Sequence, residues 1–229
     1  MSSTKKKKTL VSYAVNLILT GLLFVVLFLL MNTGVMNRYQ VDLVTMVCIN
    51  VILAVSLNLV TGVLGQLVLG HAGFMLVGAY AAALFTKSCG LPLSIALPIG
   101  LVLAGLLAAV FGVIIGIPAL RLRGDYLAII TLGFGEIIRV VANNLEITKG
   151  AMGLSDIQSL SNRDHPAAMF VYAFVLAVLV IFMMFTFGRS RHGRAVIAIR
   201  EDEIAAESSG INTTYYKLLA FVMAAFIAG

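Results

Sequence analysis

A glycine-rich segment at residues 61–73 holds two polar side chains, Gln66 and His71, inside an otherwise apolar stretch. The four glycines around them are Gly62, Gly65, Gly70 and Gly73. Glycine permits bends, and broken backbone inside a membrane is tolerated only where protein buries it or where it lines a water-filled cavity. The segment could therefore line a path for a solute. A tight turn between two helices has the same composition, and composition alone favours the turn.

Two ionisable side chains, Glu136 and Arg139, lie in the apolar run that contains Thr131. Residues three apart share a helix face, so the two side chains can form an ion pair. Ionisable groups within a membrane span are costly and usually face the bundle interior or water. A pathway pair and an intrahelical ion pair near the membrane surface fit this spacing equally well. We count Thr131 with them among the candidate path residues.

The most polar part of the chain covers residues 188–212. Its charges form blocks, basic up to Arg200 and acidic over 201–207. Residues 194–209 could form a helix that stops at Gly210, because glycine is common just after a helix end. A solvated surface helix and a docking helix for a soluble partner both fit, and composition does not decide between them.

The sequence holds no pattern typical of a catalytic or metal site. Its histidines (71, 165 and 192) are scattered, and Cys48 and Cys89 show no CxxC spacing. No HExxH or Walker motif is present. We therefore expect a chain that is not an enzyme and holds no metal, and any ATP use must come from another chain.

Composition indicates that membrane-spanning helices carry these residues. Of 229 residues, 61% are apolar and 11% are charged, against about 25% charged in a soluble domain. This composition excludes an ordinary soluble enzyme and a nucleic-acid binder. A membrane barrel is excluded because its strands alternate polar and apolar residues. We expect an all-α, polytopic integral membrane protein.

The gaps between charges predict six complete spans and a truncated seventh. The six cover residues 10–31, 43–60, 72–86, 93–118, 126–142 and 167–187, and the seventh begins at Leu218. The residues from Leu218 onward rise about 18 Å, short of the roughly 30 Å of hydrocarbon. We therefore expect a chain that is incomplete at its C-terminus.

Basic residues predict the orientation. The lysines at 5–8 place the N-terminus in the cytoplasm. Alternate crossings then place Arg121, Arg123 and residues 188–217 on the same side. The loops expected outside carry fewer basic residues, namely Arg38, Lys87, Lys149 and Arg163. Crossing parity and charge bias therefore agree.

Small residues recur at every fourth position of the span at 93–118, which keeps them on one helix face. Their small side chains let membrane helices approach closely. We expect this face to pack against another helix, in this chain or in a partner. The members of this ladder are Gly100, Ala104, Ala108, Gly112 and Gly116.

Three segments of the chain resemble the permease subunits of branched-chain amino acid ABC transporters, of the LivM type. Residues 62–74, GVLGQLVLGHAGF, are similar to the family's GxxGQxSLGHAxF element. Residues 121–137, RLRGDYLAIITLGFGEI, are similar to its RLRGxYxAIxTLxFxEI element. Residues 200–212, REDEIAAESSGIN, with YKLLAF at 216–221, are similar to its cytoplasmic loop.

Two positions depart from the family's patterns. Val68 stands where the family usually has serine, which removes a hydroxyl group. Ile204 stands where the general ABC-permease loop has glutamate. The matches nevertheless run in order from about residue 60 to the end of the chain.

The resemblance implies a multi-pass permease of the bacterial cytoplasmic (inner) membrane that imports branched-chain or related apolar amino acids by alternating access. It implies as partners a second, related permease subunit, two cytoplasmic ATP-binding subunits and a periplasmic or extracellular substrate-binding protein. ATP and Mg²⁺ would bind the ATP-binding subunits, and this chain would hold no cofactor. Residues 1–229 would form a single permease domain, with residues 188–217 as its cytoplasmic coupling loop.

The resemblance also assigns roles to residues. The loop at 200–210 would dock on the ATPase, with Ala205 and Ala206 entering a cleft and charges fixing the register. The docking candidates are Arg200, Glu201, Asp202, Glu203, Ala205, Ala206, Glu207 and Gly210. The path candidates are Gly62, Gly65, Gln66, Gly70, His71, Gly73, Thr131, Glu136 and Arg139.

Other functions stay open on the sequence. Close relatives with these motifs include permeases for urea, short amides and other small solutes. An ion-coupled secondary transporter is the alternative from another class. Such carriers place ionisable groups at mid-membrane, and here only Glu136 and Arg139 lie within an expected span. A structural membrane protein without transport is disfavoured by the glycine-rich segment.

The orientation makes a testable prediction. A thiol reagent that cannot cross the membrane, applied to intact cells, will label Ser155→Cys and leave Ser190→Cys unlabelled, because residues 188–217 are expected in the cytoplasm. Labelling is measured by mass shift on the purified chain. Reaction at Ser190→Cys in sealed cells would contradict the span count.

Overall fold

The computed structural model describes residues 2–122, 124–155, 157, 160 and 167–229. The regular secondary structure in these ranges is all helical, with no strand. The all-α fold expected from the sequence is thereby confirmed. Arg123, Arg163 and His165 lie outside the described residues, as do the side chains of the lysines at 5–8.

The chain divides into two compact units. The first unit holds α1 (Ser2–Asn32), the first half of α2 (Arg38–Asn58) and the beginning of α6 (Ala168–Arg189). Its core is built largely from aromatic and aliphatic side chains, with the Phe24 and Phe170 rings stacked at a centroid distance of 6.0 Å. The buried members of this core are Met31, Val41, Cys48, Ala167, Phe170 and Ala173.

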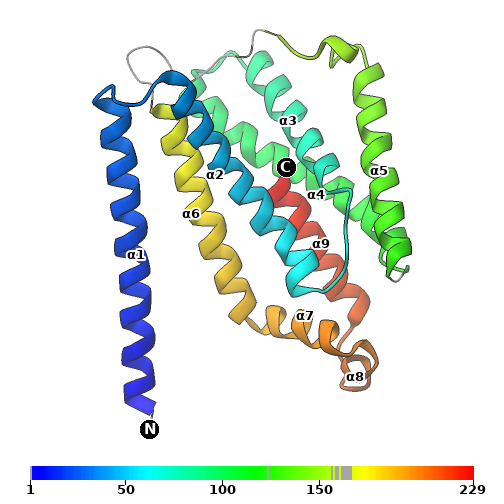
Figure 1. Ribbon diagram of the computed structural model, residues 1–229. Coiled ribbons are helices and arrows are strands. Elements are labelled where there is room, and N and C mark those ends of the chain that lie inside the picture. The colour runs from blue at the N-terminus through cyan, green and yellow to red at the C-terminus, as the bar shows by residue number, and fades with distance from the viewer. Residues whose placement is uncertain (1, 123, 156, 158–159, 161–166) are drawn as a thin grey trace. The chain divides into compact units, whose positions relative to one another are not determined.

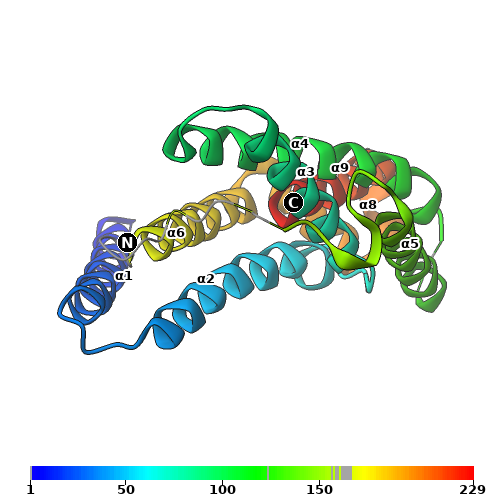
Figure 2. The ribbon, with the colours of Figure 1, turned by 90° about the horizontal axis from the view of Figure 1, so that it is seen from above.

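The second unit, residues 49–160 and 177–229, contains all the segments that the sequence singled out for transport and coupling. Helices α3, α4 and α9 pack side by side within it, as both views show (Figures 1 and 2). Its other elements include the ends of α2 and α6. The bounds in this unit are η1 Leu59–Val63, α3 His71–Ser88, α4 Leu93–Ala119, α5 Asp125–Asn144, η2 Gly150–Met152, α7 Arg191–Glu201, α8 Glu203–Ser208 and α9 Thr213–Ala228.

The ladder of small residues on α4 is buried between helices of this chain. Near the beginning of α4, Gly100 lies against Phe85 of α3, and farther along, Gly112 lies against Ala225 of α9. In a membrane the hydrophobic effect does not drive helices together, so close packing of this kind stabilises their association through van der Waals contact. All five positions are buried, namely Gly100, Ala104, Ala108, Gly112 and Gly116.

Each expected span coincides with a helix. Among the described residues, three helical stretches are long and apolar enough to cross a membrane by length and composition, namely Arg38–Val63, Leu93–Ala119 and Ala168–Arg189. Shorter apolar helices cover Ile18–Asn32 and Thr213–Ala228. The full count of crossings stays a prediction.

Two helix boundaries differ from the sequence expectation. The expected single helix at 194–209 is divided at Asp202, whose extended backbone (φ −156°) ends α7 and whose carboxylate caps the N–H groups of Ile204 and Ala205. Helix α9 begins at Thr213 rather than Leu218, because the side chain of Asn212 accepts a hydrogen bond from the N–H of Tyr215. Both caps satisfy backbone groups that a helix start leaves free.

Candidate functional site

The membrane helix α2 ends in a break rather than a simple turn. Its last turn widens into the π-helix η1, and residues 64–70, which form the break, then run without helical structure until α3 begins at His71. Gly65 adopts φ +76°, a left-handed conformation that other residues rarely tolerate. Figure 1 shows the chain rising from the end of η1 to the start of α3. The segment is therefore an extended stretch, longer than the tight turn that composition favoured.

Helix α5 holds the extended segment in place. The Thr131 hydroxyl accepts a hydrogen bond from the Leu69 N–H at 3.2 Å and donates one to the Ala128 carbonyl at 3.0 Å. Gly70 lies so close to the Thr131 backbone that a Cβ at this position would overlap the Thr131 carbonyl oxygen. The sequence candidates Gly70 and Thr131 are thus brought together, and the contact requires glycine.

A buried pair of polar side chains joins the two helices that flank the break. Ser56 of α2 and His71 of α3 lie with Oγ and Nε2 2.7 Å apart. The Ser56 Oγ atom also lies 2.8 Å from the Leu53 carbonyl oxygen. The Ser56–His71 contact therefore bridges α2 and α3 on either side of the break. Sequence reasoning missed Ser56, which lies in a largely apolar run without a charged residue.

Gln66 lies in the middle of the break. Its Oε1 atom is buried, and no group in the described part of the chain donates a hydrogen bond to it. A buried polar atom without a partner costs about 1–3 kcal/mol. Such a cost, in a segment already held by other contacts, is typical of a site where a ligand, water or another chain supplies the missing donor.

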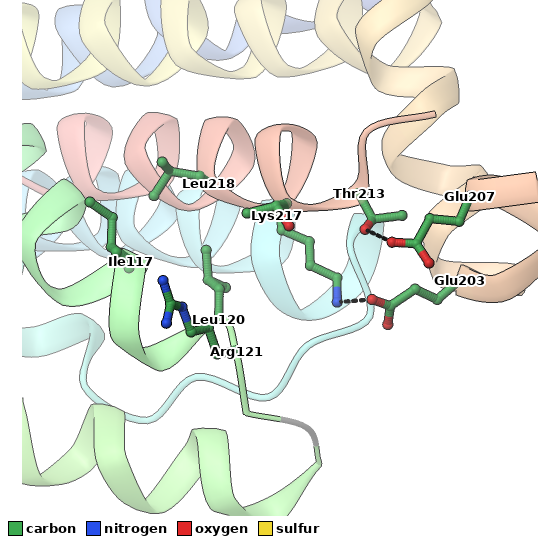
Figure 3. A pocket seen from close by; sticks show the side chains of 10 residues that line it. Ile117, Leu120, Arg121, Glu203, Glu207, Thr213, Lys217 and Leu218 are labelled. Atoms are coloured by element: carbon green, nitrogen blue, oxygen red, sulfur yellow. Dashed lines mark hydrogen bonds and ion pairs between the residues drawn. The ribbon is translucent and has the colours of Figure 1, made fainter. Parts of the chain in front are cut away.

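The polar segment that follows α6 is fixed to α9 by two charged contacts (Figure 3). The Lys217 ammonium forms an ion pair with Glu203 at 2.6 Å, and its side chain is only 6% exposed. One turn farther along α8, Glu207 accepts a hydrogen bond from the Thr213 hydroxyl at 3.0 Å. These two contacts attach α8 to the beginning of α9.

A cavity of about 320 Å³ separates α8 from the end of α4 (Figure 3). Both charge signs line it, with aliphatic side chains on the α4 side. Helix α8 is thus tied to α9 but faces α4 across open space. The lining residues are Gly116, Ile117, Leu120, Arg121, Glu203, Glu207, Thr213, Thr214, Lys217 and Leu218.

The two alanines of α8 have different surroundings. Ala206 is 4% exposed and packs in the core of the second unit, whereas Ala205 is exposed. The entry of both alanines into a partner's cleft stays a prediction, and in this chain Ala206 is covered by the core. The large apolar side chain that α8 exposes is Ile204, at 71% exposure. At the helix end, Gly210 adopts φ +82°, as expected of a glycine stop.

Arg200, at the end of α7, reaches back to the break. Its Nη1 donates a hydrogen bond to the Gly62 carbonyl at 2.8 Å, and its aliphatic stem lies against Gly65. A second pair joins its guanidinium to Glu201. The polar segment after α6 and the break after α2, separate in the sequence analysis, are therefore in direct contact.

A sequence model of the family described as "Branched-chain amino acid transport system / permease component" matches residues 39–229. The chain belongs to this family. Two similar proteins are the high-affinity branched-chain amino acid transport system permease proteins LivM of Salmonella typhimurium and Escherichia coli, each 40% identical over 84% of this chain and 51% of the relative. This chain thus spans about half the length of those relatives. A probable LivM of Methanocaldococcus jannaschii is 27% identical over 48% of this chain. No solved structure gave a significant match.

The permease-family match includes both the break and the segment that contacts it. Glu136 and Arg139 lie elsewhere on α5. They form the intrahelical ion pair that their spacing allows, and both side chains are more than half exposed. The geometry therefore joins Thr131 to the break and leaves this ion pair on an open face of the helix. Among the described residues, no group of three or more His, Cys, Asp or Glu side chains could hold a metal ion.

The buried ion pair between Lys217 and Glu203 yields a stability prediction. Glu203→Ala leaves the Lys217 ammonium buried without its partner, and we expect a loss of about 2 kcal/mol. That is less than the 3–5 kcal/mol typical of fully buried pairs, because the Glu203 side chain is 25% exposed. The matched control is Glu201→Ala, at a side chain that is 67% exposed, and we expect it to lose less than about 1 kcal/mol. Denaturant unfolding in detergent measures both, and equal losses would contradict the assigned role of the pair.

Proposed function

We propose that this chain is a membrane-spanning permease subunit of an ABC importer for branched-chain or related apolar amino acids. Membership of the permease family supports the proposal, as do the names of the two LivM relatives. In this proposal residues 1–229 act as one permease domain, and residues 188–217 form its cytoplasmic coupling loop. The chain lies in the bacterial inner membrane with its N-terminus in the cytoplasm.

The observation that carries the proposal is the break at residues 64–70. A membrane helix keeps its backbone groups satisfied internally, so a break persists only where protein or a water-filled path covers it. Discontinuous helices form substrate sites in many transporters for this reason. The buried, unpartnered Oε1 of Gln66 lies in this break, and an amino acid's ammonium group is a donor of the kind that this oxygen lacks.

The remaining path candidates take supporting roles in this proposal. Thr131 holds the extended segment through Leu69. The Ser56–His71 pair fixes the relation between α2 and α3 on either side of the break. The glycines at 62, 65, 70 and 73 let backbone approach closely and bend. Glu136 and Arg139 satisfy each other on α5, and we assign them to the wall of the path rather than to substrate binding.

Transport would proceed by alternating access without covalent chemistry in this chain. Two cytoplasmic ATP-binding subunits would hold ATP and Mg²⁺, a second permease subunit would complete the path, and a binding protein would deliver the amino acid. The residues of 200–210 would meet an ATPase subunit. Ile204 supports this contact, because a large apolar side chain that is 71% exposed on a cytoplasmic helix is suited to a partner's pocket.

The experiment that tests the function is uptake by the complete transporter in proteoliposomes. Labelled leucine, isoleucine and valine are offered first, and urea and acetamide serve as competitors for the alternative substrates. We expect ATP-dependent uptake of the amino acids that urea and acetamide do not inhibit. Uptake that follows an ion gradient without ATP would overturn the proposal in favour of a secondary transporter.

A variant of Gln66 tests its place in the path. Gln66→Leu keeps the side chain's size and removes the unpartnered oxygen, so we expect uptake to fall about tenfold or more while thermal stability stays equal or rises. Gln40→Leu, at an exposed glutamine of the first unit, is the matched control and should transport normally. Normal uptake by Gln66→Leu would show that this oxygen does not meet the solute.

A further inference from the structure

Arg200 makes a contact that a docking residue would not need. It lies near the end of α7, and its side chain is 42% exposed. Instead of pointing wholly outward, it donates to the Gly62 carbonyl at 2.8 Å, across 138 residues of sequence. The last carbonyls of a helix lack intrahelical donors, and a cation near this end is favourable. Arg200 therefore completes the end of η1, the point at which the break begins.

Apolar contacts make this connection firm. Val196 and Ile199 of α7 are buried in the same core cluster as Leu59, Val60 and Leu64 around η1. The stem of Arg200 lies on Gly65, where a Cβ would overlap the Arg200 Cγ atom. Helix α7 thus rests on η1 through both polar and apolar groups, and a displacement of α7 reaches the start of the extended segment directly.

Asp202 divides the segment after α6 into two helices, α7 and α8. On one side, α8 is attached to α9 through Lys217–Glu203 and Thr213–Glu207. On the other side, α7 is attached to the break through Arg200. Because the single extended residue Asp202 joins α7 and α8, a displacement of α8 would reach both α9 and the break. The cavity between α8 and the end of α4 leaves room for that movement.

We propose that Arg200 is a positioning residue that transmits movement of the α7–α8 segment to the backbone at Gly62 and Gly65, and so opens or closes the path at the break. This inference rests on the proposed function, in which residues 200–210 meet an ATPase. It changes the role of Arg200 from a docking charge to a link inside the permease. Coupling of this kind needs an element with two arrangements that both ends bias, and here that element is residues 64–70.

The first test measures coupling in the complete transporter. Arg200→Gln removes the cation and shortens the side chain, so we expect ATPase association and substrate-stimulated hydrolysis within about twofold of normal, with solute imported per ATP reduced about tenfold or more. Arg200→Lys keeps one ammonium donor and should give an intermediate ratio. Arg194→Gln is the matched control, because Arg194 is an exposed arginine of α7 that donates to the Arg189 carbonyl next to its own helix. Its import ratio should be unchanged.

The second readout does not depend on the identity of the solute. Leu67 is an exposed residue of the extended segment, and the thiol labelling rate of Leu67→Cys is measured in the complete transporter with and without ATP. We expect ATP to change this rate severalfold with Arg200 present and to have no effect after Arg200→Gln. Under Arg194→Gln the response to ATP should persist.

The outcomes separate this inference from the proposed function. If the unmodified transporter imports none of the offered solutes but labelling at Leu67→Cys still responds to ATP through Arg200, the link stands and the substrate assignment falls. If import works and Arg200→Gln keeps both the import ratio and the labelling response, the link is refuted. A parallel loss of hydrolysis and import in Arg200→Gln and Arg200→Lys would also refute it, since that pattern belongs to a docking or folding role.

Discussion

The lack of hydrogen-bond partners in hydrocarbon is the constraint on which this structure depends. Backbone N–H and C=O groups inside a bilayer must be satisfied by the protein itself, and residues 64–70 leave the helical ladder directly after the long apolar stretch Arg38–Val63. Specific groups of the chain bind this backbone. The Gln66 N–H donates to the Val60 carbonyl and the Leu69 N–H donates to the Thr131 hydroxyl. The Gly62 carbonyl accepts a hydrogen bond from Arg200. Gly70 permits the approach of α5 that this pairing needs.

Close helix contact in the second unit serves the same constraint. The buried ladder on α4 brings α3 and α9 close, and α9 in turn anchors α8 through Lys217 and Glu203. The segment after α6 is therefore connected to the helix bundle at α9 and to the break at η1. A structure with these two connections can convert a force on α8 into a change of backbone at the break. The Oε1 of Gln66 is the polar atom that this enclosure leaves without a partner among the described residues.

The sequence predicted the helices well because their signals are local. Uncharged runs marked the spans, and the glycines at 61–73 indicated a departure from helix. The boundary at Asp202 was missed although an aspartate is a common N-cap residue. Asp202 lies between two glutamates, so its capping role could not be distinguished from the acidic block by sequence alone. Asn212 before α9 is a second cap of this kind.

The contacts that give the site its character depend on tertiary structure. Lys217 is buried with Glu203 of another helix as its ion-pair partner. The role of Ser56 depends on its contact with His71, whose Nε2 atom lies 2.7 Å from the serine Oγ atom. The contact between Arg200 and Gly62 joins segments that were interpreted separately. Periodicity and charge in the sequence do not indicate which carbonyl a side chain such as Arg200 will bind.

Electron cryomicroscopy of the complete transporter proposed for this chain, with and without bound ATP, would show directly whether the break moves. We expect residues 64–70 to be enclosed by protein and to shift relative to α5 between the two states, with the Leu69–Thr131 hydrogen bond present in one state only and Arg200 bonded to Gly62 in both. A segment that faces lipid, or that keeps one position while α7 and α8 move, would refute coupling through the break.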